Sequence, residues 1–85
     1  MLLHDFMTLL YFGIARDCAG VSGETISLDR DVTVMQLWDL LVERRPGLAA
    51  CRSLSRVAVD MHYAGENDPV PQGAEVAIIP PVAGG

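Results

Sequence analysis

The sequence predicts an α+β fold in which a mixed sheet of about four strands packs on one main helix. The chain has 85 residues, which is enough for one domain with a small core. Four short segments have the composition or the period-2 alternation of strands. One central segment has the apolar spacing of an amphipathic helix. Together these observations favour a sheet covered by a helix on one side.

The first two strands are predicted at the amino-terminal end. Residues Met7–Ile14 (MTLLYFGI) are rich in aliphatic and aromatic side chains, which is typical of a strand. Residues Asp17–Gly23 contain two glycines and are predicted to form a loop. Residues Glu24–Leu28 then alternate between polar and apolar, as half-buried strands do. Because the connection is short, we expect these two strands to form an antiparallel hairpin.

A helix is predicted over Val34–Arg45. Thr33 and Gln36 have the spacing of a capping box, in which each side chain satisfies a free backbone N–H. Val32 and Leu37 are placed as a hydrophobic staple around that cap. The last predicted turn ends in arginine at Arg45, and a positive charge there suits the negative end of the helix dipole. The Pro46-Gly47 pair then ends the helix. The apolar face comprises Val34, Leu37, Trp38 and Leu41.

The rest of the chain supplies two more strands. Residues Leu48–Ser55 fit either a short helix or a loop. Residues Arg56–Tyr63 alternate, with Val57, Val59 and Met61 on one face. Residues Gly65–Gly73 contain two prolines and read as a loop, and Glu75–Ile79 reads as the last strand.

The order β-β-α-β-β allows a right-handed crossover that places the last strand parallel to the first, in the middle of the sheet. That arrangement is the β-grasp, or ubiquitin-like, architecture. We expect one such domain over residues 1–85, with 80–85 as a flexible C-terminal tail.

Composition excludes several classes of function. Eleven acids against six arginines, with no lysine, give a net charge of -5, which argues against nucleic acid as a partner. No apolar run reaches the ~18–20 residues of a membrane span, and the first ten residues lack the basic start of a secretory signal. Cys18 and Cys51 are too few for a disulfide scaffold and suit a reducing, cytoplasmic compartment, although one bridge between them stays open.

The side chains that often carry chemistry have simpler interpretations here. His4 and His62 are far apart and lack a third ligand, so no metal site is predicted. The acids Asp29, Asp31 and Asp39 fit a solvated surface better than paired acid–base catalysts. No serine lies in a nucleophile motif, and no glycine-rich phosphate loop is present. We therefore expect this chain to bind no ATP itself.

The first and last strands, which are predicted to lie side by side in the middle of the sheet, look apolar on both faces. Leu9 and Tyr11 point to one side, and Leu10 and Phe12 point to the other. The last strand has the same property, with Ala77 and Ile79 opposite its other apolar residues. One face must meet the helix, so the other is either a surface for a partner or is covered by residues 48–55 and the loops.

The last six residues have an unusual composition. Pro80 and Pro81 hold the backbone extended, and Val82, Ala83, Gly84 and Gly85 are small or lack a side chain. Six extended residues reach ~20 Å, which is enough to enter a narrow channel of another protein. A terminal carboxylate can be activated there as a mixed anhydride by an adenylating partner. A sulfur or nitrogen nucleophile can then take the acyl group.

Four segments resemble the small subunits of molybdopterin synthases. The end IIPPVAGG (78–85) and the segment LYFGIARDCAG (10–20), with its aromatic pair and Arg16, are the most specific. The capped helix TVMQLWDLL and the turn GAEV (73–76) are similar as well. The resemblance covers roughly residues 7–85. Residues 1–6 precede the usual start of that family, so either Met1 or Met7 is the initiator.

The resemblance implies a sulfur carrier that is not catalytic alone and binds no cofactor. An ubiquitin-activating-like adenylyltransferase would use ATP to adenylate Gly85, and a sulfur donor enzyme would convert it to a thiocarboxylate. The small subunit would dock on the large subunit through Phe12, Ile79 and Arg16, and insert Pro80, Pro81, Val82, Ala83 and Gly84 into its active site. The sulfur would pass to the pterin precursor within a heterotetramer of two small and two large subunits.

Three other functions stay open at this point. The chain could carry sulfur for thiamine synthesis or tRNA thiolation. It could be a β-grasp interaction module without covalent chemistry, or a ubiquitin-like tag, although without lysines it cannot build lysine-linked chains of itself. The net charge of -5 either steers the chain toward a basic cleft on its acceptor or only keeps it soluble.

Overall fold

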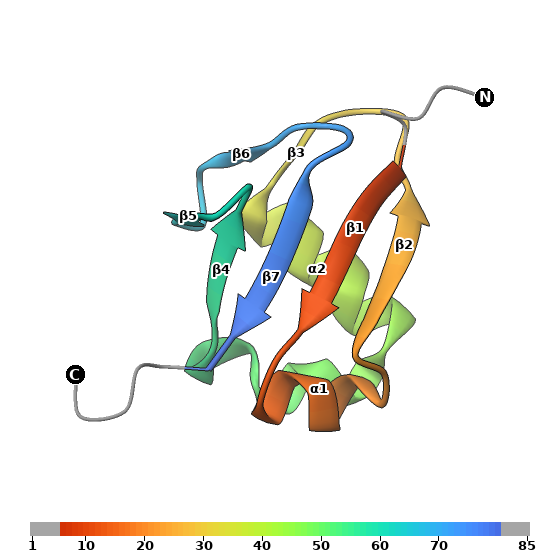
Figure 1. Ribbon diagram of the computed structural model, residues 1–85, viewed down its shortest axis with the longest axis vertical. Coiled ribbons are helices and arrows are strands. Elements are labelled where there is room, and N and C mark those ends of the chain that lie inside the picture. Colours follow the sequence, from red (N-terminus) through yellow and green to blue (C-terminus); the bar gives the residue numbers. More distant parts are fainter. Residues whose placement is uncertain (1–5, 81–85) are drawn as a thin grey trace.

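The computed structural model describes residues 6–80 of the chain and shows a five-stranded sheet with one long helix behind it (Figure 1). The strand order in the sheet is β2-β1-β7-β4-β5. The strands are β1 (Phe6–Tyr11), β2 (Gly23–Ser27), β4 (Arg56–Val59), β5 (His62–Ala64) and β7 (Glu75–Ile79). A second, two-stranded sheet pairs β3 (Val32–Thr33) with β6 (Pro69–Val70).

The first and last strands of the predicted order, β1 and β7, run parallel side by side, as the β-grasp prediction expects. Strand β7 lies beside β1 with Leu9 opposite Val76 and Tyr11 opposite Ile78, and β2 pairs with β1 in the antiparallel sense. Strand β7 has the bounds predicted from the sequence. The α+β class and the β-grasp architecture are therefore confirmed.

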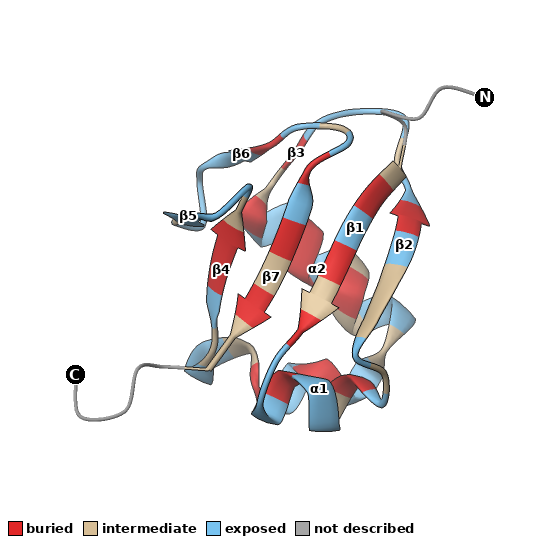
Figure 2. Cartoon of the chain, viewed as in Figure 1, coloured by how far each residue is buried: buried red, intermediate tan, exposed pale blue. Residues whose placement is uncertain are grey.

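Helix α2 (Val34–Arg44) starts and ends within one residue of the predicted helix. The capping box is present, because Gln36 N donates to Thr33 Oγ1 at 3.2 Å and Thr33 N donates to Gln36 Oε1 at 2.9 Å. Its predicted apolar face is buried against the sheet, and Figure 2 shows buried residues both on the central strands and on the helix behind them. The sheet contributes Met7, Leu9, Tyr11, Ile26, Val57, Val76 and Ile78 to this core.

The first strand is shorter than predicted, because it stops at Tyr11 rather than Ile14. Gly13 has φ +55°, a value that side chains disfavour, and the chain turns there into the short helix α1 (Ile14–Ala19). The predicted loop at 17–23 is therefore helical up to Ala19, and Gly20 ends the helix in the left-handed conformation.

The segment predicted as one strand, Arg56–Tyr63, is a hairpin of β4 and β5. Asp60 and Met61 form its turn with φ 48° and 73°, and two positive φ values define the tight hairpin turn that matches strand twist. The sheet gains a fifth strand for this reason. Placing Met61 on the same face as Val57 was wrong, because its side chain is 89% exposed in the turn.

The ambiguous segment after α2 forms two 3₁₀ turns, Pro46–Ala50 and Arg52–Leu54. The first packs against α1 and α2, with Leu48 fully buried, so it lies on the helix side of the sheet. Strand β6 forms within the predicted loop 65–73, where it closes over the start of α2. No helix in the described part of the chain is long and apolar enough to cross a membrane.

Candidate functional site

The point where the chain leaves the sheet is built from the ends of the two central strands. Because β1 and β7 are parallel, they end at the same edge. The ladder continues one residue past β1, since Phe12 N donates to Ile78 O at 3.0 Å. A Cβ on Gly13 would lie 2.8 Å from Pro80 Cγ, so only a residue without a side chain lets Pro80 pack this closely. We call Phe12, Gly13, Ile79 and Pro80 the tail base.

Most of the predicted tail falls outside the described part of the chain. Pro80 is described and is half-buried at the tail base. Pro81, Val82, Ala83, Gly84 and Gly85 lie outside residues 6–80, so their predicted insertion and the predicted chemistry at Gly85 stay predictions. The structure does place the start of this segment next to Phe12.

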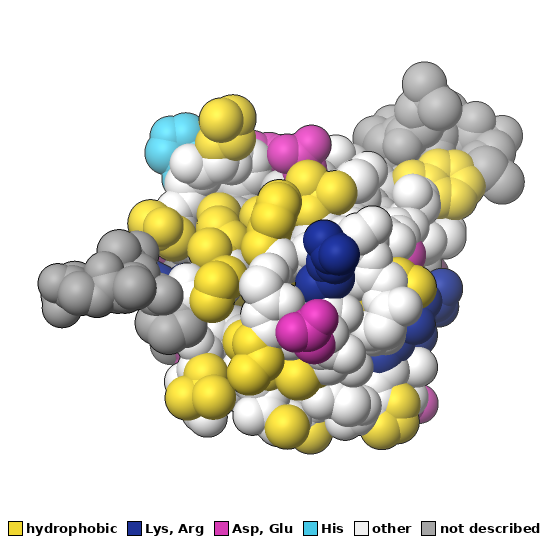
Figure 3. Space-filling view, turned by 60° about the horizontal axis from the view of Figure 1, so that its bottom comes forward, with side chains coloured by type: hydrophobic (Ala, Val, Ile, Leu, Met, Phe, Trp, Pro, Cys, Tyr) yellow, Lys and Arg dark blue, Asp and Glu magenta, His cyan; other side chains and the backbone are white. Residues whose placement is uncertain are grey.

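The sheet face opposite α2, here called the open face, carries two rows of neighbouring side chains. One row runs across the sheet as Leu10, Ala77, Ala58 and Tyr63, which are successive register partners. The next row toward the tail contains Phe12, Ile79 and Arg56, with Ile79 directly opposite Arg56. Figure 3 shows apolar side chains gathered over this end of the molecule.

The open face is accessible within residues 6–80. Phe12 is 47% exposed and Tyr63 is 54% exposed, while Ile79 is half-buried. Of the two explanations for an apolar second face, cover by residues 48–55 does not occur, because that segment packs on the helix side. Exposed aromatic side chains beside a half-buried aliphatic patch are typical of a protein-binding surface.

Sequence reasoning missed two members of this surface, Tyr63 and Met61. They line a hollow of about 290 Å³ on the open face, above the small side chains Ala58 and Ala77. The single-strand interpretation of 56–63 could not pair Tyr63 with Ala58. The turn that pairs them carries Asp60-Met61 instead of the Asn-Gly or Asp-Gly sequence that signals such a hairpin.

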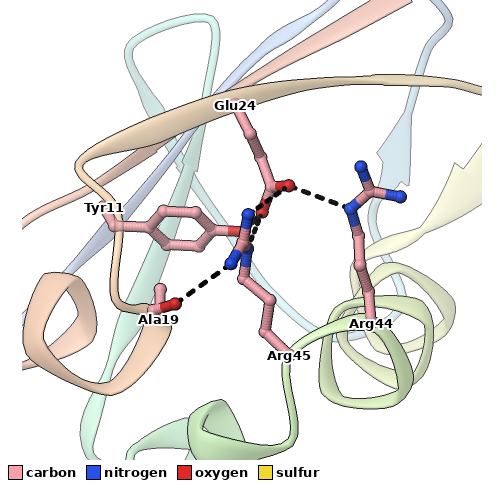
Figure 4. A network of polar contacts seen from close by, with 5 residues as sticks. All are labelled: Tyr11, Ala19, Glu24, Arg44 and Arg45. Atoms are coloured by element: carbon pink, nitrogen blue, oxygen red, sulfur yellow. Dashed lines mark hydrogen bonds and ion pairs between the residues drawn. The ribbon is translucent and has the colours of Figure 1, made fainter.

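Arg16 lies on α1, one turn beyond the tail base, and its side chain is exposed. Helix α1 has only six residues, so its position depends on tertiary contacts. The guanidinium of Arg45 supplies one such contact, because Nη1 donates to Ala19 O at 3.2 Å at the end of α1 (Figure 4). The end of α2 therefore helps to hold the helix that carries Arg16.

The same arginine belongs to a polar network centred on Glu24 (Figure 4). Arg45 donates to both carboxylate oxygens, with Nε to Oε2 at 2.6 Å and Nη2 to Oε1 at 3.1 Å. Arg44 Nε donates to Oε1 at 2.9 Å, and the Tyr11 hydroxyl donates to Oε2 at 2.7 Å. The network ties β1, β2 and the end of α2 together.

These contacts shift the proton affinities of the network. The hydrogen bonds from Arg45 are the main reason that the pKa of Glu24 falls from 4.5 to about 2, against the opposing effect of burial. Burial and the neighbouring Glu24 carboxylate raise the pKa of Tyr11. Contact with Glu24 raises the pKa of Arg45. Near neutral pH Glu24 and Arg45 therefore stay ionised and Tyr11 stays neutral, which suits a structural role better than proton transfer.

The other candidates are placed as surface or core residues. Asp29 and Asp39 are exposed and pair with arginines, and Asp31 accepts a hydrogen bond from Gln72 N. His62 is exposed on the edge strand β5, and His4 lies outside the described residues. Within residues 6–80, no three His, Cys, Asp or Glu side chains are grouped to hold a metal ion.

The two cysteines are free thiols on the helix side of the molecule. Cys18 is half-buried and Cys51 is fully buried in the core. Burial raises the pKa of the Cys51 thiol, so it remains protonated at neutral pH. Trp38 is also a core residue, as predicted, with the Arg52 guanidinium 5.8 Å from its ring centre.

Known proteins with similar sequences and structures point the same way as the tail and the open face. A human protein named molybdopterin synthase sulfur carrier subunit is 38% identical over 91% of each chain. The crystal structure of SAMP1 from Haloferax volcanii superposes with a TM-score of 0.79 at 26% identity, covering 94% of this chain and 99% of that one. A chain from the complex of subunits 1 and 2 of the molybdopterin-converting factor from Helicobacter pylori has the same fold, with a TM-score of 0.65 at 18% identity over 94% and 99% of the two chains.

The family assignment rests on nearly the whole sequence. Residues 9–85 match the sequence model of the ThiS family, from the second half of β1 to the final glycine. This range contains all four segments on which the resemblance to molybdopterin synthase small subunits was based. The resemblance is confirmed, and the chain belongs to the ThiS family.

Proposed function

We propose that this chain is the sulfur carrier subunit of a molybdopterin synthase. The observation that carries the proposal is the tail base, where Pro80, the first residue of the segment that ends in Gly-Gly, follows the sheet beside an exposed apolar face. The human relative of 38% identity carries the name of that subunit. The described residues offer a docking surface and an exit point for the tail, so catalysis belongs to partner enzymes.

The chemistry takes place at the carboxylate of Gly85. An adenylyltransferase partner joins this carboxylate to the α-phosphate of ATP, and pyrophosphate leaves. A sulfur donor enzyme then supplies a nucleophilic sulfur that attacks the acyl carbon, and AMP leaves to give the thiocarboxylate. Transfer of that sulfur to the pterin precursor, with water supplying the oxygen, returns the carboxylate. Small side chains at 82–85 leave the acyl carbon accessible to each nucleophile.

Docking supplies the geometry that this transfer needs. Phe12 and Ile79 of the tail base, together with Arg16 on α1, contact the large subunit, which holds the active site. The five residues after Pro80 span ~16 Å when extended, so the reacting group acts at a distance from the docked face. The H. pylori complex of subunits 1 and 2 is consistent with such a large partner. We place the carrier in the cytoplasm, where free thiols such as Cys18 stay reduced.

Mass spectrometry tests the proposal directly. The full chain is incubated with its activating enzyme, ATP and a sulfur donor, and we expect the exchange of one oxygen for sulfur at Gly85. A variant lacking Gly84-Gly85 is the matched control and should gain no sulfur. An unchanged mass of the full chain, with an activating enzyme shown to consume ATP, would contradict the proposal.

A second measurement separates the synthase from other sulfur pathways. The thiocarboxylated chain is mixed with large subunit and pterin precursor, and formation of the dithiolene product is followed. A carrier for thiamine or tRNA thiolation would form the thiocarboxylate but leave the precursor unchanged. A non-covalent β-grasp module would fail at the first step.

A further inference from the structure

The six arginines of the chain divide into two groups by their ion pairs. Four of them contact carboxylates of the same chain at 2.6–3.2 Å. These are Arg30 with Asp29, Arg44 and Arg45 with Glu24, and Arg52 with Asp39. Arg16 and Arg56 have no carboxylate within ion-pair distance among residues 6–80. Their charges are the ones left available to another molecule on this part of the chain.

Arg56 lies in the row of the open face that borders the tail. It is the first residue of β4 and pairs with Ile79, the last residue of β7 before Pro80. Because Ala58 is two residues further on the same strand and belongs to the open-face row, Arg56 points to the open face as well. Its side chain is exposed. A cation therefore stands directly beside the aliphatic side chain that the docking surface uses.

Tyr63 holds this cation in position. The guanidinium carbon of Arg56 lies 4.1 Å from the centre of the Tyr63 ring, within the range of a cation–π contact. The stack restricts a side chain that otherwise loses much rotamer freedom when it binds. A planar guanidinium fixed over a ring is also well suited to bind a carboxylate through two parallel hydrogen bonds.

We propose that Arg56, presented by Tyr63, is a specificity-determining contact that binds a carboxylate side chain of the large-subunit partner at the rim of the docked tail base. This inference rests on the proposed function and adds a charge preference to it. Arg16, the other arginine of this group, lies on α1 three residues after Gly13 of the tail base and is followed by the exposed Asp17, so Arg56 carries the charge preference by itself. The net charge of -5 is a property of the whole chain, and it does not describe this rim.

The binding partner thus needs an acidic group at the entrance of its tail channel, even though the chain as a whole favours a basic partner. Charges at the rim of an interface act mainly on the association rate and its salt dependence. We expect Arg56→Ala to weaken binding to the large subunit by about twofold to fivefold at low salt, which is the upper part of the range for an exposed ion pair. Arg56→Lys keeps the charge but loses the planar stack, and should retain only part of the affinity.

The experiment measures the affinity of the full chain for its large subunit at ~50 mM and ~500 mM salt, by a method that also gives the association rate. Arg30→Ala is the matched control, because Arg30 is exposed and already paired with Asp29. The proposal expects a loss for Arg56→Ala that is largest at low salt, a larger loss for Arg56→Glu, and no change for Arg30→Ala. Thermal unfolding of each variant checks that the fold is kept.

The outcomes separate this inference from the proposed function. If the natural chain fails to bind the large subunit, the proposed function fails. If the natural chain binds and Arg56→Glu binds as well as Arg30→Ala at low salt, the assignment of Arg56 is wrong while the sulfur carrier function stands. A loss that is equal at both salt concentrations also overturns the assignment, since it would show a packing contact instead of an ion pair.

Discussion

Replacing Glu24 by glutamine removes one negative charge from the network that joins β1 and β2 to the end of α2. The amide keeps the size of the carboxylate and can still accept one or two hydrogen bonds. It no longer neutralises Arg44 and Arg45, and the Arg45 side chain is only 28% exposed. The variant therefore isolates the electrostatic part of the network from its packing.

The size of the effect follows from the proton affinity of Glu24. Its pKa falls from 4.5 to about 2 in the folded chain, and its side chain is only 8% exposed, so solvent screens the contacts little. A pKa difference of one corresponds to about 1.4 kcal/mol, so ionised Glu24 adds about 3 kcal/mol to the free energy of unfolding at pH 7. Because the folded pKa is the lower one, this contribution is complete above pH 4.5 and is lost as the pH falls toward 2. About half of it should remain at pH 3.

Urea unfolding, followed by the fluorescence of the single tryptophan Trp38, measures the difference between the natural chain and Glu24→Gln at both pH values. The other ten acids are common to both chains, so their titration cancels in this difference. We expect a gap of about 3 kcal/mol at pH 7 that narrows to about 1.5 kcal/mol at pH 3. Asp39→Asn is the control, since Asp39 is 67% exposed and its pair with Arg52 should contribute below about 1 kcal/mol.

Two results would refute this reasoning. A gap that is equal at pH 7 and pH 3 would show that the loss comes from hydrogen-bond geometry or packing, because only a titrating charge depends on pH. A gap at pH 7 no larger than that of Asp39→Asn would show that solvent screens the Glu24 contacts despite their burial.

Three further predictions test other parts of the structure. Thr33→Ala removes the cap of α2 and should lower the free energy of unfolding by about 1 kcal/mol in urea titrations, while Ser at this position should restore it. Met61→Gly removes a side chain from a positive-φ position of the β4–β5 turn, so it should raise the free energy of unfolding by about 0.5–1 kcal/mol in thermal unfolding. A lower free energy of unfolding would show that the contacts of the Met61 side chain stabilise the turn more than its backbone conformation destabilises it. Phe12→Ala should leave stability nearly unchanged and weaken binding to the large subunit by about tenfold or more, and equal binding would remove Phe12 from the docking surface.

The parts of the fold that sequence alone predicts are those specified by local signals. Helix α2 has a capping box, a staple and a 3.6-residue apolar period, and all three act within a dozen residues. Strand β7 has a clear start after a turn and a clear stop at Pro80. The parallel pairing of β1 and β7 was predicted from the order of the elements, which allows a right-handed crossover, rather than from either strand alone.

The parts that sequence reasoning missed depend on contacts between distant residues. Helix α1 is too short to be stable by itself, and Arg45, which supports its end, lies 26 residues away from Ala19. Glu24 and Arg45 are 21 residues apart, so their ion pair exists only once the sheet and α2 have packed. In the candidate site, the alternation of side chains along β1 and β7 was enough to place Phe12 and Ile79 on the open face. Arg56 and Tyr63 could be placed there only from the register between strands.

Stability and docking depend on opposite faces of the same sheet. Variants on one face can therefore serve as controls for variants on the other. The Glu24 network and the main cluster of core residues lie on the α2 side of the sheet, and none of them belongs to the open face. Glu24→Gln should therefore lower the urea midpoint while the folded fraction still binds the large subunit normally. Phe12→Ala and Arg56→Glu should do the reverse, because their side chains are exposed and bury little area in the free chain. If an open-face variant lowered the midpoint as much as Glu24→Gln, a loss of binding could be explained by unfolding, and the open face would no longer be supported as a docking surface by these experiments.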